Sequence, residues 1–240
     1  YDRALAAAKD FRLQNMVVSE MSGVFGKEAV LARCKGRVDA EPDNVSNLEV
    51  YAHLLFINGQ REEALQVCVR IGELAVTRED KIFTVLAQGM LLDNMERYPE
   101  AKAKYEEALK IDPQQSTALN NLAYLLVERM DNAAEALPYA RQAQRLNPND
   151  PGVLDTLGWT LARNRQWGEA AGMLLRAIEI DRENAAALYH LAMTHQARGE
   201  SEEAKQRLAA AQKAAEAQGN KDLLPKIREA LNELEKAGGR

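Results

Sequence analysis

The chain has 240 residues, of which 46% are hydrophobic and 28% charged, a balance typical of a folded protein and not of a disordered one. Its net charge of −5 and the lack of a Lys/Arg block argue against nucleic acid or an anionic membrane as a partner, because both need a basic surface. No apolar run approaches the ~20 residues of a membrane span, which argues against membrane insertion. The abundance of Ala, Leu and Glu favours helix.

The chain begins at Tyr1 and not at Met, and it carries no secretory signal pattern. We therefore expect a segment of a longer protein, for which both a cytoplasmic and an exported location stay open. The two cysteines, Cys34 and Cys68, have neither CxxC spacing nor a neighbouring His cluster. They are predicted to be buried free thiols and not a disulfide or a metal site.

Residues 1–44 predict a degenerate helix pair. Apolar residues between 16 and 25 define one helical face, those between 29 and 38 define another, and Pro42 ends the segment.

A Glu-Ala dipeptide then recurs through the middle of the chain. Its alanines are spaced by 37, 35, 34 and 34 residues and are Ala64, Ala101, Ala136, Ala170 and Ala204. Seven residues after the last four of these lie Ala108, Ala143, Ala177 and Ala211. A third series of small residues lies upstream, at Ala52, Gly89, Ala123, Gly158 and Ala192. Three series with one period indicate repeats of two helices, whose small residues let the two backbones approach closely.

The period divides residues 45–218 into five repeats, which are 45–81, 82–115, 116–150, 151–184 and 185–218. The third repeat has one extra residue, which we expect in a longer turn between its helices. Residues 219–240 predict a C-terminal helix with one apolar stripe and a polar outer face. Such a helix would cap the stack of repeats; docking on another chain is the alternative.

This pattern resembles the tetratricopeptide repeat. The repeat 151–184 carries the resemblance best, through Leu154, Leu157, Gly158, Leu161, Trp167, Ala170, Leu174 and Ala177. The resemblance covers residues 45–217 and implies an all-α fold, a right-handed α-solenoid (superhelix) of stacked antiparallel helix pairs.

The chain shows no pattern of catalytic or cofactor chemistry. Its three histidines, His53, His190 and His195, form no metal-binding motif, and His195 is expected to be a packed side chain. Neither a phosphate-binding loop nor a nucleophile elbow is present. The chain is therefore predicted not to be an enzyme and to hold no metal or cofactor.

In a repeat of this kind the first helix lines a concave surface. The residue after each small position of the first helix is rotated by about 100°, toward that surface. This series is His53, Met90, Tyr124, Trp159 and Met193. Positions one helical turn away add Asn94, Asn120, Glu128, Asp155, Arg163 and Tyr189. We predict that these residues form a groove for an extended or helical partner segment. The alternative is that the large side chains pack on neighbouring repeats.

The two tryptophans are given different roles. Trp167 precedes a Glu-Ala pair and is expected to close the corner between two helices, so that Trp167→Ala costs ~3 kcal/mol or more. Trp159 is the expected ligand anchor, whose removal abolishes partner capture with little loss of fold.

The sequence thus predicts a scaffold for protein–protein interaction, with another protein or peptide as its partner. Two alternatives stay open. The repeats could assemble into a homo-oligomer, or they could be a regulatory or targeting part of a larger enzyme or of a secretion apparatus.

Overall fold

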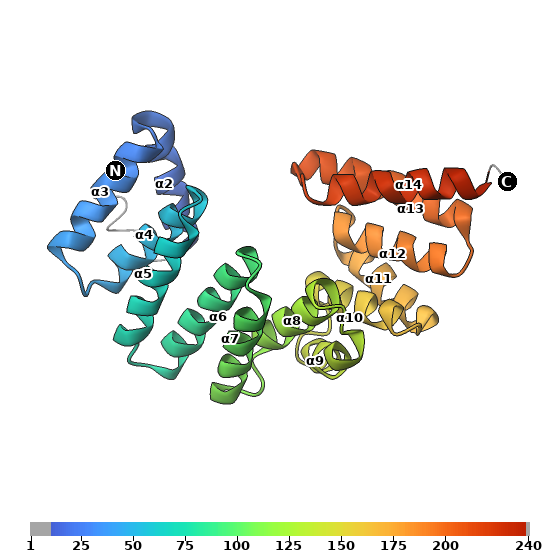
Figure 1. Cartoon of the computed structure of the whole chain (residues 1–240), viewed down its shortest axis with the longest axis horizontal. Helices are drawn as coiled ribbons and strands as arrows, with labels where there is room; N and C mark the ends of the chain where they lie inside the picture. Colours follow the sequence, from blue (N-terminus) through green and yellow to red (C-terminus); the bar gives the residue numbers. More distant parts are fainter. Residues whose placement is uncertain (1–10, 239–240) are drawn as a thin grey trace. The chain divides into compact units, whose positions relative to one another are not determined.

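The computed structural model describes residues 11–238, and within that range the regular structure is helical. The chain divides into two compact units, Tyr1–Pro113 and Gln114–Arg240, which we call the N-terminal and the C-terminal unit. Consecutive helices in each unit pack against one another, as Figure 1 shows for the described residues.

The described part of the N-terminal unit consists of six helices, each packed on the next. They are α2 (Phe11–Phe25), α3 (Lys27–Ala40), α4 (Val45–Ile57), α5 (Arg61–Leu74), α6 (Arg78–Asn94) and α7 (Tyr98–Ile111). Residues of α2 and α3, Met21 and Cys34 among them, form a buried cluster with Val50 and Leu54 of α4. Cys34 and Cys68 are both buried free thiols, as predicted, and burial raises the pKa of Cys68 to about 11.

In the C-terminal unit each helix also packs on the next one along the chain. In addition, the first helices of successive repeats touch one another, since α10 contacts both α8 and α12. Its elements are α8 (Ser116–Tyr124), the π-helical segment η1 (Leu125–Arg129), α9 (Ala133–Leu146), α10 (Pro151–Arg163), α11 (Trp167–Ile180), α12 (Ala185–Ala197), α13 (Ser201–Gln218) and α14 (Leu223–Gly238). Helix α14 packs on α12 and α13, where Ile227, Ala230 and Leu234 close a buried cluster.

The small residues lie where the two helices of a repeat meet. The five alanines of the Glu-Ala pairs have no exposed surface. A Cβ added at Gly158 would stand 2.6 Å from Leu174 Cγ, and one added at Gly89 would stand 2.6 Å from Tyr105 Cε1. Only a residue without a side chain fits at these two contacts, which confirms the expected close approach.

Two local features differ from the expectations. The boundary drawn between residues 81 and 82 falls inside α6, because Thr77 and Asp80 form a capping box that starts this helix at Arg78. The extra residue of the third repeat does not lengthen the turn. It is absorbed within the first helix by η1, where the N–H of Met130 bonds to the carbonyl of Leu125 in the i→i+5 pattern of a π-helix.

The turn between the two helices of each repeat contains one residue with positive φ. At this position stand Gly59, Glu96, Asp131, Arg165 and Gly199, with φ of 80°, 60°, 52°, 60° and 79°. Glycine adopts this left-handed conformation without strain, whereas the three other residues pay a steric cost.

Candidate partner-binding faces

The face of each first helix that points away from its own second helix is the candidate site, and we call it the first-helix face. The five small residues that precede the groove series are all buried. The five members of the groove series are each partly or largely exposed. This difference follows from the 100° rotation between successive helical residues.

In the C-terminal unit, the side chain of Trp159 contacts three other side chains. Its ring stacks on His190 of α12, with centroids 4.5 Å apart and planes 11° from parallel. Its Nε1–H donates to Glu128 Oε2 at 2.9 Å, and the guanidinium of Arg163 lies 5.3 Å from its ring centroid. Trp159 therefore joins three neighbouring repeats, a role that the groove hypothesis did not include.

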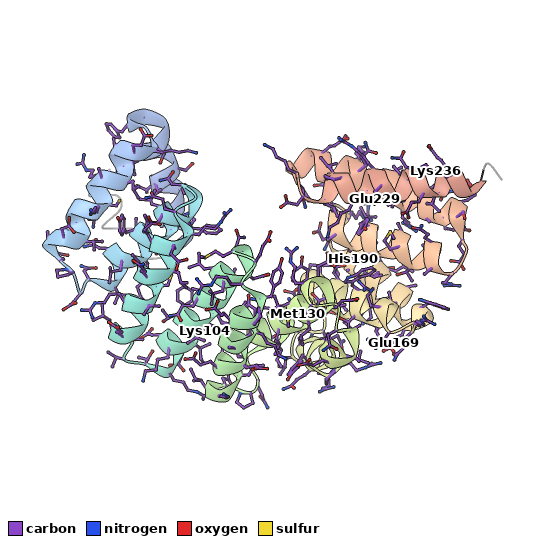
Figure 2. All side chains as sticks on the ribbon, viewed as in Figure 1. Lys104, Met130, Glu169, His190, Glu229 and Lys236 are labelled. Carbon is purple, nitrogen blue, oxygen red and sulfur yellow. The ribbon has the colours of Figure 1, made fainter. Side chains whose placement is uncertain are left out.

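Below this ring lies a buried polar pair. His190 Nδ1 donates to Asp155 Oδ1 at 2.7 Å, and the two residues are 6% and 8% exposed. Figure 2 marks His190 inside the C-terminal unit, where α12 packs on α10. Because Trp159 covers the imidazole and Asp155 occupies its Nδ1, this pair holds two repeats together and does not form an open catalytic dyad.

Glu128 connects this network to the C-terminal helix. Lys226 Nζ of α14 lies 2.5 Å from Glu128 Oε1, 98 residues away in the sequence. Burial acts to raise the pKa of Glu128, but the bond and charge of Lys226, with His190 and Trp159, hold that pKa below its ordinary value. Glu128 lies in the π-helical turn of η1, so the extra residue of the third repeat falls next to this contact.

The remaining expected groove residues of the C-terminal unit surround the network. Tyr124, Tyr189 and Met193 are partly exposed, and Arg163 pairs with Asp131 at the neighbouring turn. Burial, with the charges of Glu128, Glu229 and Glu233, raises the pKa of Tyr189. Asn120 is partly buried, and its Oδ1 has no hydrogen-bond partner among the described residues.

In the N-terminal unit the first-helix face is open. Met90 is 56% exposed and Asn94 is also exposed, while His53 on α4 is partly buried and has its pKa lowered by burial. Phe83, seven residues before Met90 on α6, is 55% exposed.

Three residues at these faces were not among the predicted site residues. Phe83 could have been found from its seven-residue spacing to Met90, which places both on one helical face. His190 lies 35 residues after Asp155, about one repeat length, which indicates only weakly that the two residues meet. Nothing in the sequence indicates that Lys226 of the capping helix reaches Glu128.

Other chemistry is sparse in the part of the chain that the structure describes. Residues 11–238 contain no group of three His, Cys, Asp or Glu side chains arranged for a metal ion. None of the described helices is both long and apolar enough to cross a membrane. His195 is largely buried and contacts Glu200 through Nδ1 at 2.6 Å, so it is a packed side chain as expected.

Comparison with known proteins defines the class. Models of the tetratricopeptide repeat match residues 86–151 and 173–206. A TPR repeat-containing protein of Pseudomonas aeruginosa is 27% identical over 140 residues, which are 58% of this chain and 23% of that protein. The chain contains tetratricopeptide repeats, and it spans about a quarter of the length of this relative.

Solved structures of low sequence identity share the fold. The crystal structure of YrrB, a TPR protein with an unusual peptide-binding site, has a TM-score of 0.56 at 23% identity and covers 82% of this chain and 97% of its own. MamA from Desulfovibrio magneticus RS-1 has a TM-score of 0.57 at 18% identity and covers 74% and 97%. The APC/C hetero-tetramer Cut9–Hcn1 has a TM-score of 0.72 at 12% identity and covers 97% and 44%. The fold is that of an all-α helical repeat. Tetratricopeptide repeats as a class serve as scaffolds for protein–protein interaction.

Proposed function

We propose that this chain holds an extended or helical segment of a partner protein on its first-helix faces. One observation carries the proposal. At the five equivalent repeat positions that follow the buried small residues, the chain keeps large side chains, and each retains exposed surface. Large aromatic and Met side chains that are neither buried nor surrounded by charge are common anchors of peptide recognition.

The second helices support this assignment by contrast. Ion pairs repeat along their outer faces and starts, such as Arg97, just before α7, with Glu62 of α5, and Arg141 of α9 with Glu169 of α11. Such exposed pairs favour solubility and contribute little binding energy. The first-helix faces therefore offer the apolar surface that a partner could cover.

A displayed library of random peptides, selected on the purified chain, tests the proposal. Selected peptides are titrated against the wild type, against Met90→Ala in the N-terminal unit and against Tyr124→Ala in the C-terminal unit. Loss of an anchor at the centre of an interface should weaken binding at least about tenfold. The matched controls are Val69→Ala on α5 and Leu175→Ala on α11, two partly exposed apolar residues of second helices, which should leave binding unchanged.

Two results would overturn the proposal. One is that no peptide is enriched over an unrelated helical protein. The other is that every enriched peptide binds both first-helix variants as tightly as it binds the wild type.

A further inference from the structure

A single stripe of side chains runs along α6 of the N-terminal unit. Its members follow one another at spacings of 3, 4, 3 and 4 residues and are Asp80, Phe83, Ala87, Met90 and Asn94. These spacings keep all five on one side of a helix, over about 21 Å of its length. We call this surface the α6 stripe.

The middle of the stripe is apolar and uncovered. Phe83 and Met90 are 55% and 56% exposed, and Ala87 between them is half-buried. The two large side chains start about 10 Å apart, because seven residues of helix lie between them. An amphipathic helix presents apolar side chains at the same seven-residue interval, so a second helix can cover both.

The N-terminal end of the stripe is acidic. Glu49 of α4 lies near Asp80, and burial together with the charge of Asp80 raises the pKa of Glu49. Glu49 also contributes to the raised pKa of Cys68. Neither Glu49 nor Asp80 forms an ion pair within the described residues. A half-buried carboxylate next to a second one, without a cation, is a site where a positive side chain would relieve repulsion.

Two basic residues of α6, Arg78 and Lys81, lie close to Asp80 in the sequence. Lys81 directly follows Asp80 and is rotated from it by about 100°, off the stripe, and Arg78 is engaged elsewhere. Arg78 donates to the carbonyl of Ile111 and pairs with Asp112, both at the end of α7. The start of α6 offsets part of the charge of Asp80, which lies in the first turn of that helix, but Glu49 lies in the interior of α4. Neither Arg78 nor Lys81 forms an ion pair with Glu49 or Asp80 within residues 11–238, which leaves room for a cation from another molecule.

We propose that the α6 stripe binds an amphipathic helical segment of a partner protein, with two apolar residues seven positions apart over Phe83 and Met90 and a Lys or Arg one turn beyond them, against Glu49 and Asp80. This proposal rests on the proposed function, and it specifies the chemistry of the partner at one of its faces. Helix-on-helix packing supplies the contact area, and the basic residue sets the direction of the segment.

The probe is a stapled helical peptide of about 16 residues, long enough to cover the stripe. It carries two Leu seven positions apart. Two versions are made, with two Arg one helical turn before the first Leu or one turn after the second. In a Glu counterpart of each version, both Arg are replaced by Glu. Binding is measured by fluorescence anisotropy at about 50 mM and about 300 mM salt, since the attraction between exposed charges is screened over this range.

We expect the better Arg peptide to bind at least about tenfold more tightly than its Glu counterpart at low salt, with a smaller ratio at high salt. The double variant Glu49→Gln/Asp80→Asn should reduce the ratio to below about threefold, and the amide side chain that replaces the Asp80 carboxylate keeps an oxygen for the cap of α6. The matched control Glu63→Gln/Glu106→Gln removes the same net charge from the second helices α5 and α7 and should leave the ratio unchanged.

The other outcomes separate this proposal from the proposed function. Equal binding of Arg and Glu peptides, abolished by Phe83→Ser, keeps the groove function and overturns the basic partner. Binding that survives Phe83→Ser/Met90→Ser lies elsewhere and overturns the α6 stripe. A doubled mass in sedimentation, lost in the same double variant, assigns the stripe to a second copy of this chain and also overturns the proposal. If the random library yields no binder and neither the Arg nor the Glu peptides bind, the proposed function is overturned as well.

Discussion

Met90 of the N-terminal unit and Trp159 of the C-terminal unit occupy the same position of their repeats, yet their surroundings differ. Met90 leaves more than half of its surface exposed and lies on a stripe with the equally exposed Phe83. Trp159 is stacked on His190 and bonded to Glu128, which in turn pairs with Lys226 of α14. One repeat position thus provides an open surface in one unit and a link between repeats in the other.

Repeat position alone therefore does not define a binding anchor. What decides is whether the neighbouring first helices, before and after it in the chain, supply complementary side chains. In the C-terminal unit α12 supplies His190 and η1 supplies Glu128, and both come within contact of Trp159.

The largest effect is expected from His190→Ala. This variant leaves the carboxylate of Asp155 buried without its partner and opens a void under Trp159, which together should cost about 3–5 kcal/mol. Urea unfolding followed by tryptophan fluorescence reports on the C-terminal unit alone, because both tryptophans, Trp159 and Trp167, lie there.

The reference for that measurement is His53→Ala in the N-terminal unit. His53 is only partly buried, so its loss should shift circular dichroism melting slightly and leave the tryptophan signal unchanged. If His190→Ala and His53→Ala destabilise the chain equally, the Asp155–His190 pair does not link repeats.

Trp159→Ala and Met90→Ala test the comparison directly. Because Trp159 joins three repeats, its truncation should cost about 2–3 kcal/mol in urea unfolding monitored by circular dichroism. Truncation of Met90 should change stability by less than about 0.5 kcal/mol, as for an exposed surface residue.

Trp159→Phe is the control variant, since it keeps an aromatic ring over His190 and loses only the hydrogen bond to Glu128. It should retain more than half of the stability that Trp159→Ala loses. Equal and small effects of Trp159→Ala and Met90→Ala would restore the sequence-based view that Trp159 can be removed with little loss of fold.

Much of the fold could be predicted from the sequence because close packing leaves a periodic trace. Helices that touch at Gly158 tolerate no side chain there, so small residues recur at the period of the repeat. The place of the extra residue could not be predicted, because a longer turn and a π-helical turn add the same number of residues. The partners of Trp159 were missed for a related reason: Glu128, His190 and Lys226 come from three other elements, and their convergence depends on how repeats stack.

Acid titration should affect Glu128 and Glu49 in opposite directions. The pKa of Glu128 lies below its ordinary value of 4.5, so its stabilising contribution is present above pH 4.5 and is lost as the pH falls through the folded-state value. The pKa of Glu49 lies above 4.5, so its contribution to stability is present below pH 4.5 and is lost as the pH rises through the folded-state value.

Glu128→Gln and Glu49→Gln separate these two contributions. Relative to wild type, Glu128→Gln should be less stable at pH 7 and approach wild type in acid. Glu49→Gln should be more stable at pH 7, where it removes an ionised and half-buried carboxylate, and should match wild type below about pH 4.5. Urea midpoints measured across this range check both trends, and a Glu49→Gln variant that is less stable at pH 7 would contradict the absence of a cation beside Glu49.

A small effect, the same in both units, is expected at the turns between the helices of a repeat. Glu96 in the N-terminal unit and Arg165 in the C-terminal unit hold the left-handed turn position with φ of 60°, where other repeats have Gly59 and Gly199. Replacing either residue by Gly relieves backbone strain but adds freedom to the unfolded chain, so each variant should gain only about 0.5–1 kcal/mol. Equal gains for Glu96→Gly and Arg165→Gly in urea unfolding would show that the turns behave alike and that the units differ at their first-helix faces. A gain confined to one unit would place part of the difference in the backbone, and the contrast between Met90 and Trp159 would then not be a matter of side-chain contacts alone.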